Sequence, residues 1–153
     1  MKISIESELP CDQVSTDLLA IGVFFENAPI TQGHIGMLDW RLNGFLSKII
    51  LKTQFKRQWM EQALIPCPYR LRAKSVLLLG LGERQEFSTS RQAQYLIEVL
   101  KASKKLKLSH VCLSIENLGM SEAEIRSCLE KAKAQFSHLQ EFTLLPSMKD
   151  AVQ

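Results

Sequence analysis

The sequence has no Cys-x-x-Cys pair, few histidines and no long apolar run, and each of these absences excludes a class of protein. Four cysteines occur among the 153 residues; they are Cys11, Cys67, Cys112 and Cys128. Their wide spacing argues against a zinc or redox motif, so we expect reduced thiols buried as small hydrophobic side chains. For Cys67, which lies in a proline-rich loop, an exposed thiol is an alternative interpretation.

Metal binding finds no support in the pattern of histidines. A metal site needs three or four convergent ligands, whereas His34, His110 and His138 are scattered and no pair has helical spacing. We therefore predict no metal, no cofactor and no catalytic residue, and expect isolated surface or capping histidines.

No window approaches the roughly 20 apolar residues that cross a bilayer, and "MKISIESELP" has no apolar run typical of a signal peptide. We therefore expect a cytoplasmic protein that does not enter membranes. The excess of Lys and Arg over Asp and Glu, 19 against 16, is too small to predict a nucleic-acid partner unless it gathers on one face.

The length and the 46% hydrophobic content predict one folded domain, residues 1–146, followed by a loose tail, residues 147–153. Strands are expected at residues 2–6, 18–25, 63–65, 76–79, 111–115 and 142–145. Helices are expected from 35 to about 55, from about 89, and from 121 to about 136, with capping boxes at Thr89/Gln92 and Ser121/Glu124. This order predicts a three-layer α/β/α sandwich around a mixed, mostly parallel sheet.

These segments, taken in order, resemble a known family. The stretches are "DLLAIGVFFENAPI", "LDWRLNGFLSKII", "KSVLLLGLGERQEFSTSRQAQYLIEVLKASKKLK" and "HVCLSIENL". Together they are similar to the N-terminal domain of leucyl aminopeptidases, over residues 17–145. The most specific parts are "LLLGLGERQEF" and the helix that carries Asp39, Leu42, Gly44 and Leu46.

The resemblance implies a macro-domain-like fold. In that family the peptidase chemistry, with its metal-binding carboxylates and a lysine, lies in a separate C-terminal domain, and nothing in this sequence resembles that domain. The family's N-terminal domain contributes to packing in a hexamer. Macro domains that bind ADP-ribose use glycine-rich loops, which would correspond here to residues 27–36, with Gly33 and Gly36.

The turn in "LLLGLGERQEF" is a second candidate for ligand binding. Gly80 and Gly82 could bring backbone amides to an anion at the switch between strand and helix, with Arg84 offsetting the charge of Glu83. The motif lacks the third glycine of a dinucleotide fingerprint and the G-K-S/T of a P-loop. A structural turn is the alternative interpretation.

Two surfaces could bind macromolecules. Trp40, Trp59 and Met60 are large apolar residues at or beyond helix positions, so they predict an interface unless they complete the core. Tyr69 with Arg70, Arg72 and Lys74 could contact nucleic acid through stacking and phosphate pairing, but a solvated loop is the favoured interpretation.

The sequence therefore favours a non-catalytic aminopeptidase N-terminal-type domain used for self-association, protein interaction or regulation. Two alternatives stay open. The first is a module for ADP-ribose or another small anion, and the second is a chain that acts with a separate catalytic half.

Overall fold

Six strands form one sheet in the order β1-β6-β5-β2-β4-β3 in the computed structural model, which describes residues 1–27, 30, 32–67, 69–116 and 118–147. The strands are β1 (Lys2–Ile5), β2 (Thr16–Phe24), β3 (Gln62–Pro66), β4 (Ala73–Gly82), β5 (His110–Ser114) and β6 (Glu141–Leu145). All neighbours pair in parallel except β3, which is antiparallel to β4. The mixed, mostly parallel sheet is confirmed. Most of the expected tail, residues 148–153, lies outside the described residues.

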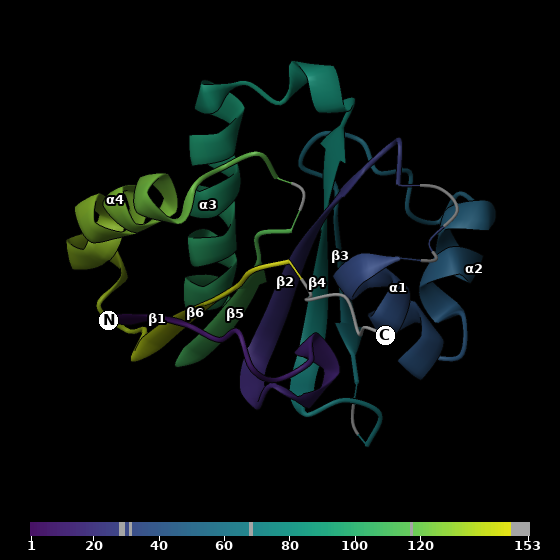
Figure 1. Cartoon of the computed structure of the whole chain (residues 1–153), viewed down its shortest axis with the longest axis horizontal. Helices are drawn as coiled ribbons and strands as arrows, with labels where there is room; N and C mark the ends of the chain where they lie inside the picture. Colours follow the sequence, from purple (N-terminus) through teal and green to yellow (C-terminus); the bar gives the residue numbers. More distant parts are fainter. Residues whose placement is uncertain (28–29, 31, 68, 117, 148–153) are drawn as a thin grey trace.

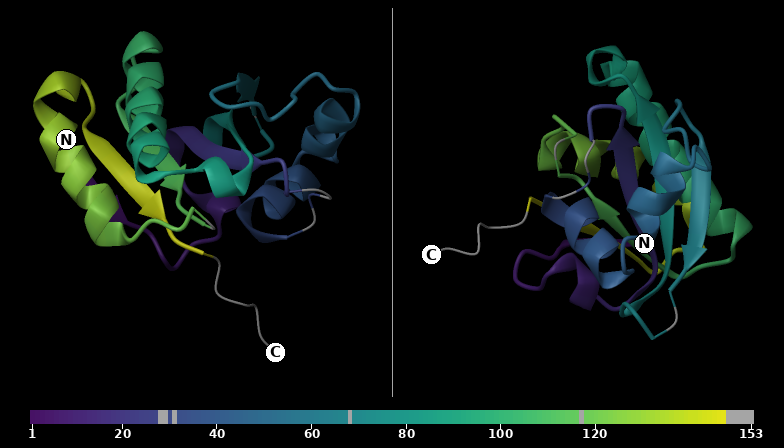
Figure 2. Two further views of the ribbon diagram at one scale, coloured as in Figure 1. Left: turned by 90° about the horizontal axis from the view of Figure 1, so that it is seen from above. Right: turned by 90° about the vertical axis from the view of Figure 1, so that its right-hand side faces the viewer.

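Helices cover both faces of the sheet, so the central strands are apolar on both sides (Figures 1 and 2). In β2, Leu18 and Ala20 face the core under α3 (Thr89–Lys105) and α4 (Glu122–Ala132). Leu19 and Ile21 face the other core, under α1 (Gly33–Arg41) and α2 (Phe45–Leu51). The unbroken apolar run follows from this double burial, because successive side chains of a strand point to opposite faces.

The helix expected from residue 35 to about 55 is two helices, α1 and α2. The break is at Gly44, whose φ of 77° places it in the left-handed region that glycine adopts without strain. A Cβ built on Gly44 would meet nothing within 4 Å. Gly44 is thus needed for its backbone angle and not for a close approach to another segment.

Of the two capping boxes predicted at helix N-termini, the one on α3 is wrong and the one on α4 is confirmed. In α3 the capping side chain belongs to Ser88, which accepts from the amide of Arg91, so the box expected at Thr89 and Gln92 is wrong by one residue. In α4 the Ser121 and Glu124 capping box is confirmed, with both reciprocal hydrogen bonds present.

The chain reverses its direction of travel across the sheet between β2 and β5. The connection that leaves β2 runs through α1 and α2 toward β3 and β4, whereas the connection that leaves β5 runs through α4 to β6 on the other side. Such a switch point opens a crevice outside the carboxyl ends of the two strands, where α/β proteins bind ligands. The expected position, at Gly80 and Gly82 at the end of β4, is therefore not the switch point.

Within the described residues, no helix is both long enough and apolar enough to cross a membrane.

Candidate functional site

Three polar side chains meet at the switch point. His34 comes from the first turn of α1, Ser114 ends β5, and Glu116 follows β5. The His34 Nδ1 atom lies 2.6 Å from the Ser114 hydroxyl and 3.6 Å from Glu116 Oε2. Because His34 is only 3% exposed, the expectation of a surface or capping histidine is wrong for it.

The Glu116 carboxylate also caps α1. Its Oε2 accepts the backbone N–H of His34 at 2.6 Å, which satisfies one free amide at the positive end of the helix. Gly33, with φ of 68°, makes room for this carboxylate, because a Cβ there would lie 2.5 Å from Glu116 Oε2. The predicted ligand-binding Gly33 therefore packs against the protein's own anion, and Gly36 lies within α1.

Burial controls the protonation of this group. Burial lowers the pKa of His34 below its usual value, and the Glu116 charge opposes part of that shift. Burial, with the nearby charges of Asp12 and Glu116, raises the pKa of Cys11 to about 12. At neutral pH we therefore expect an uncharged imidazole beside a protonated thiol, which is a poor nucleophile.

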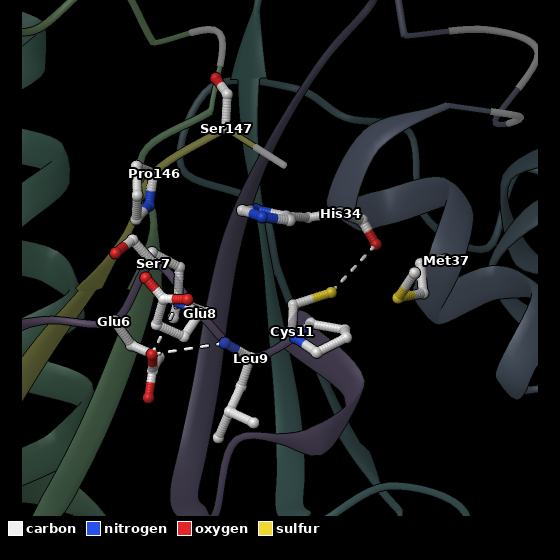
Figure 3. A pocket seen from close by; sticks show the side chains of 11 residues that line it. Glu6, Ser7, Glu8, Leu9, Cys11, His34, Met37, Pro146 and Ser147 are labelled. Carbon is white, nitrogen blue, oxygen red and sulfur yellow. Dashed lines mark hydrogen bonds between the residues drawn. The ribbon is translucent and has the colours of Figure 1, made fainter. Parts of the chain in front are cut away.

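A cavity of about 280 Å³ opens beside His34. Its walls are the loop after β1 (residues 6–11), His34 and Met37 of α1, and residues 145–147 at the end of β6. Figure 3 shows the His34 ring and the Cys11 thiol on its α1 side and the Glu6 and Glu8 side chains on the other. The Cys11 thiol donates to the His34 carbonyl, with Sγ 3.7 Å from the oxygen.

The Gly80 and Gly82 amides have another use. Gly80 N–H donates to the Glu61 carbonyl at 2.7 Å, and Gly82 N–H donates to the Arg57 carbonyl at 3.0 Å. A Cβ on Gly80 would lie 2.0 Å from the Gln58 carbonyl oxygen. The turn thus accommodates a neighbouring backbone segment, which leaves neither amide for an anion.

Arg84, which we predicted to assist anion binding at this turn, contacts Phe24 and Glu26 of the same chain. Its guanidinium lies 4.2 Å from the Phe24 ring centroid, and its backbone amide donates to the Glu26 carboxylate. Arg84 does not line the cavity beside His34.

The three predicted interface residues have different environments. Trp40, at the end of α1, is 72% exposed. Trp59 and Met60 are partly buried and pack against the core under α3 and α4, and the Arg91 guanidinium lies 4.7 Å from the Trp59 ring. Of the three, Trp40 is the one that presents a free apolar surface.

The predicted basic loop connects β3 to β4. Tyr69 is fully exposed, and Arg70 and Arg72 are exposed beside it. Lys74 pairs with the Asp17 carboxylate at 3.1 Å, so its charge is partly used to join β4 to β2.

All four cysteines are free thiols, and Cys11, Cys67 and Cys112 are buried, as expected. Cys67 is 1% exposed, so the alternative interpretation of an exposed thiol is wrong. Within the described residues, no three His, Cys, Asp or Glu side chains lie close enough together to hold a metal ion.

Ser114 and Glu116 were not predicted as site residues. The sequence signal for Ser114 and Glu116 is a pair of polar residues at the end of a buried strand, in "VCLSIE". His34 has no such signal, because it lies in the first turn of α1 and not directly after a strand. The carboxyl ends of β2 and β5 come together only because those strands are neighbours. Strand order was not readable from the pattern.

Comparison with solved structures defines the class of fold. The chain aligns with a mutant of tomato leucine aminopeptidase at a TM-score of 0.72 and 18% identity, covering 95% of this chain and 32% of that one. It aligns with the macrodomain of Mycobacterium tuberculosis DarG at a TM-score of 0.71 and 12% identity, covering 93% and 96%. The fold is therefore macrodomain-like, as predicted.

Sequence comparison then gives the family. The family model described as "Cytosol aminopeptidase family, N-terminal domain" matches residues 20–141 of the chain. A probable cytosol aminopeptidase of a Cyanothece species is 30% identical over 91 residues, which are 60% of this chain and 18% of that protein. The chain belongs to the cytosol aminopeptidase family, matching its N-terminal domain, and spans about a fifth of that relative's length.

Proposed function

We propose that this domain is non-catalytic and serves assembly, by self-association through the outer face of α1 and α2. We call this surface the α1–α2 face; it comprises Trp40, Phe45, Lys48, Leu51 and Lys52, all of them exposed. The observation that carries the proposal is the exposure of two large apolar side chains on one helical layer, 72% for Trp40 and 82% for Leu51.

Exposed groups of this size are unfavourable in water unless they are covered. Covering on the order of 150 Å² of a tryptophan contributes about 4 kcal/mol. Association costs at least about that much in lost translational and rotational freedom, so Trp40 alone does not hold a dimer. Phe45, 42% exposed at the start of α2, and Leu51 supply the remaining apolar area.

Trp40 is held in position for such a contact. The Arg41 guanidinium lies 5.0 Å from the Trp40 ring centroid, and its Nε donates to Asp12 Oδ2 at 2.7 Å. This support lowers the side-chain entropy that a partner would otherwise have to remove.

The charges on the same face decide how self-association responds to salt. Lys48 and Lys52 are exposed, and in a two-fold dimer the same face of each copy meets the other. Added salt screens the repulsion between these lysines while leaving apolar burial intact. We therefore expect the dimer to strengthen as salt rises.

Sedimentation velocity over a range of protein concentrations tests the proposal. The wild type should form a concentration-dependent dimer, and Trp40→Ala with Leu51→Ala should be monomeric. Tyr69→Ala is the matched control, because Tyr69 is 103% exposed on the β3–β4 loop, away from α1 and α2. A wild type that stays monomeric at high concentration would refute self-association.

The match to the N-terminal domain alone supports a second candidate, a chain that acts with a separate catalytic half. Co-purification with a metallopeptidase domain of the same family tests it. If Trp40→Ala abolishes that complex but the wild type alone is monomeric, the α1–α2 face serves this partner instead. A cytosolic location remains a prediction.

An ADP-ribose-like anion is a weaker candidate. The macrodomain-like fold raises it, but Glu116 already occupies the amide at the start of α1, and Glu6 and Glu8 line the cavity. A diphosphate would meet negative charge at both places. We expect no thermal stabilisation by ADP-ribose at millimolar concentration. A ligand that binds the folded state and is present at a hundred times its Kd would raise the free energy of unfolding by about 2.7 kcal/mol.

A further inference from the structure

The cavity beside His34 presents one ring nitrogen without a partner. His34 Nδ1 contacts the Ser114 hydroxyl, and a carboxylate oxygen of Glu116 lies 3.6 Å away. That negative charge favours the proton on Nδ1, because the group beside one ring nitrogen sets which tautomer is present. The lone pair of Nε2 is then free, and Nε2 has no hydrogen-bond partner among the described residues.

The His34 ring forms part of the cavity wall. Its side chain is 4% exposed, and the ring lies against the cavity (Figure 3). Nε2 is not one of the buried polar atoms without a partner, which among the described residues are Asp12 Oδ1, Arg57 Nε and Tyr95 OH. Nε2 is therefore open to the cavity, and a ligand that enters can donate a hydrogen bond to it.

Formal charge around the cavity is of one sign. Glu6 and Glu8 line it, and none of its described lining residues is Lys or Arg. Glu6 Oε2 accepts the amides of Glu8 and Leu9 at 2.9 and 3.3 Å, which fixes the loop that carries both carboxylates. The Glu8 carboxylate makes no hydrogen bond or ion pair within the described residues and is available to a cation.

The rest of the wall is apolar and the space is small. Leu9, Met37 and Leu145 contribute hydrophobic surface, and 280 Å³ lies just below the roughly 300–1,000 Å³ of common ligand pockets. A hydrogen-bond acceptor, two carboxylates and an apolar wall together fit one chemistry. We infer that this cavity binds a small primary ammonium compound with a compact apolar body, its N–H groups facing His34 Nε2 and its charge facing Glu8.

The surrounding groups fit a metal ion or an anion less well. The Cys11 thiol is protonated, and no three ligating side chains converge within the described residues. The α1 amide that could hold an anion donates to Glu116. An organic ammonium needs neither a thiolate nor a ring of ligands.

The inference is independent of self-association. None of the cavity-lining residues belongs to the α1–α2 face. A monomeric protein that binds amines, or a dimer that does not, would separate the two proposals.

Three probes test the site: isopentylamine, isopentanol and isovalerate, which are a cation, a neutral compound and an anion built on the same branched carbon skeleton. Backbone amide NMR of the wild type should show saturable shifts at Cys11, His34 and Leu145 with isopentylamine. Isopentanol should bind at least tenfold more weakly, and isovalerate should cause no saturable shift at those amides.

Two variants and one control assign the effect. Glu8→Gln, an exposed position that leaves the fold intact, should weaken isopentylamine about fivefold, as the loss of one nearby charge in a largely aqueous setting predicts. It should leave isopentanol unchanged. His34→Phe should abolish saturable binding. Glu130→Gln on α4, 58% exposed in its side chain, changes the net charge equally and should change nothing.

The inference is overturned by any of four results. These are equal affinities for isopentylamine and isopentanol, preference for isovalerate, the same amine affinity in Glu8→Gln as in the wild type, or shifts that do not saturate. If His34→Phe fails to fold, Glu8→Gln still decides the outcome.

Discussion

The backbone N–H of His34 donates to Glu116 Oε2 at 2.6 Å, across 82 positions of sequence. The first turn of α1 is therefore closed by a carboxylate that arrives from the end of β5. An acidic group at a helix N-terminus interacts favourably with the helix dipole, and here it also lies beside the His34 ring. The Glu116 side chain thus caps α1, lies beside the His34 imidazole and places a negative charge at the switch point.

Replacing Glu116 with Gln should lower stability by about 1 kcal/mol, since the amide oxygen still caps α1 but without charge. The pKa of His34 should fall further, because the carboxylate that opposes the burial effect is removed. Urea unfolding and an NMR titration of the His34 ring measure the two effects. A rise in that pKa would contradict the assigned contact.

For the wild type, lowered histidine pKa values fix the sign of the pH dependence near neutrality. The pKa values of His34 and His138 are both lowered, first by burial. Below about pH 6.5 the unfolded chain therefore binds more protons than the folded chain. The contribution of these two histidines to the free energy of unfolding is fully present above that pH and is lost as the solution is acidified through it. Histidine titrates between about pH 7.5 and about pH 5.5. A midpoint urea concentration that rises on acidification through this range would refute the expected direction of the pH dependence.

Two glycine substitutions should separate steric from backbone cost. Gly80→Ala places a Cβ 2.0 Å from a fixed carbonyl oxygen of Gln58, and we expect a loss of about 3 kcal/mol. Gly44→Ala meets no atom but retains a φ of 77°, for which about 1 kcal/mol is expected. Chemical denaturation measures both, and a smaller loss at Gly80 than at Gly44 would be inconsistent with the packing of the 57–59 segment.

Asp17 joins the amino ends of three neighbouring strands. Its Oδ2 accepts the amides of Ser109 and His110, at 3.1 and 3.0 Å, and Oδ1 lies 3.1 Å from Lys74 Nζ. Burial alone would raise the pKa of Asp17, but these hydrogen bonds and the Lys74 charge lower it below its usual value.

Asp17→Asn should therefore cost about 1–2 kcal/mol at neutral pH. The stabilisation by the ionised carboxylate is complete above the unfolded pKa of about 3.9 and disappears as pH falls through the lower folded value. The difference between wild type and variant should shrink in that acid range. A difference that is constant down to pH values on the order of 2 would argue against ionisation as its source.

Thiol labelling should distinguish one cysteine from the other three. Cys11, Cys67 and Cys112 are buried, while Cys128 on α4 is partly accessible. Burial also raises the pKa of each of the three buried thiols, and only thiolates react rapidly. Native protein should label first at Cys128 in a disulfide-exchange assay, and all four should react in denaturant. Rapid native labelling of Cys67 would contradict its burial.

The sequence predicts the sheet well because the central strands are buried on both faces. Leu19, Leu78 and Cys112 lie in apolar runs, and those residues occupy β2, β4 and β5 side by side. Double burial imposes a composition that no surface segment shares. The capping box at Ser121 was equally readable, because it depends on residues three apart.

The site was less readable because it depends on contacts between distant segments. The His34–Glu116 contact requires β2 and β5 to be neighbours, and strand order does not follow from periodicity. The same limit applies to the two tryptophans: Trp59 is covered by Arg91 from α3, whereas nothing in the local sequence distinguishes it from the exposed Trp40. Gly80 and Gly82 resemble a phosphate-binding turn in the local sequence. The carbonyls that accept from their amides belong to Glu61 and Arg57, which lie too far back in the sequence for a local pattern to reveal the contact.

Among the strands that the structure describes, β1 pairs only with β6. Ser4 bonds to Glu141 and Thr143 across this pair, so residues 2–5 have no ladder partner until residues 141–144 have left the ribosome. The central strands can assemble earlier, because β2 and β4 are both complete by residue 82. During synthesis the outer edge of this sheet therefore remains an unpaired strand, exposed to chaperones or to a wrong partner until translation passes β6.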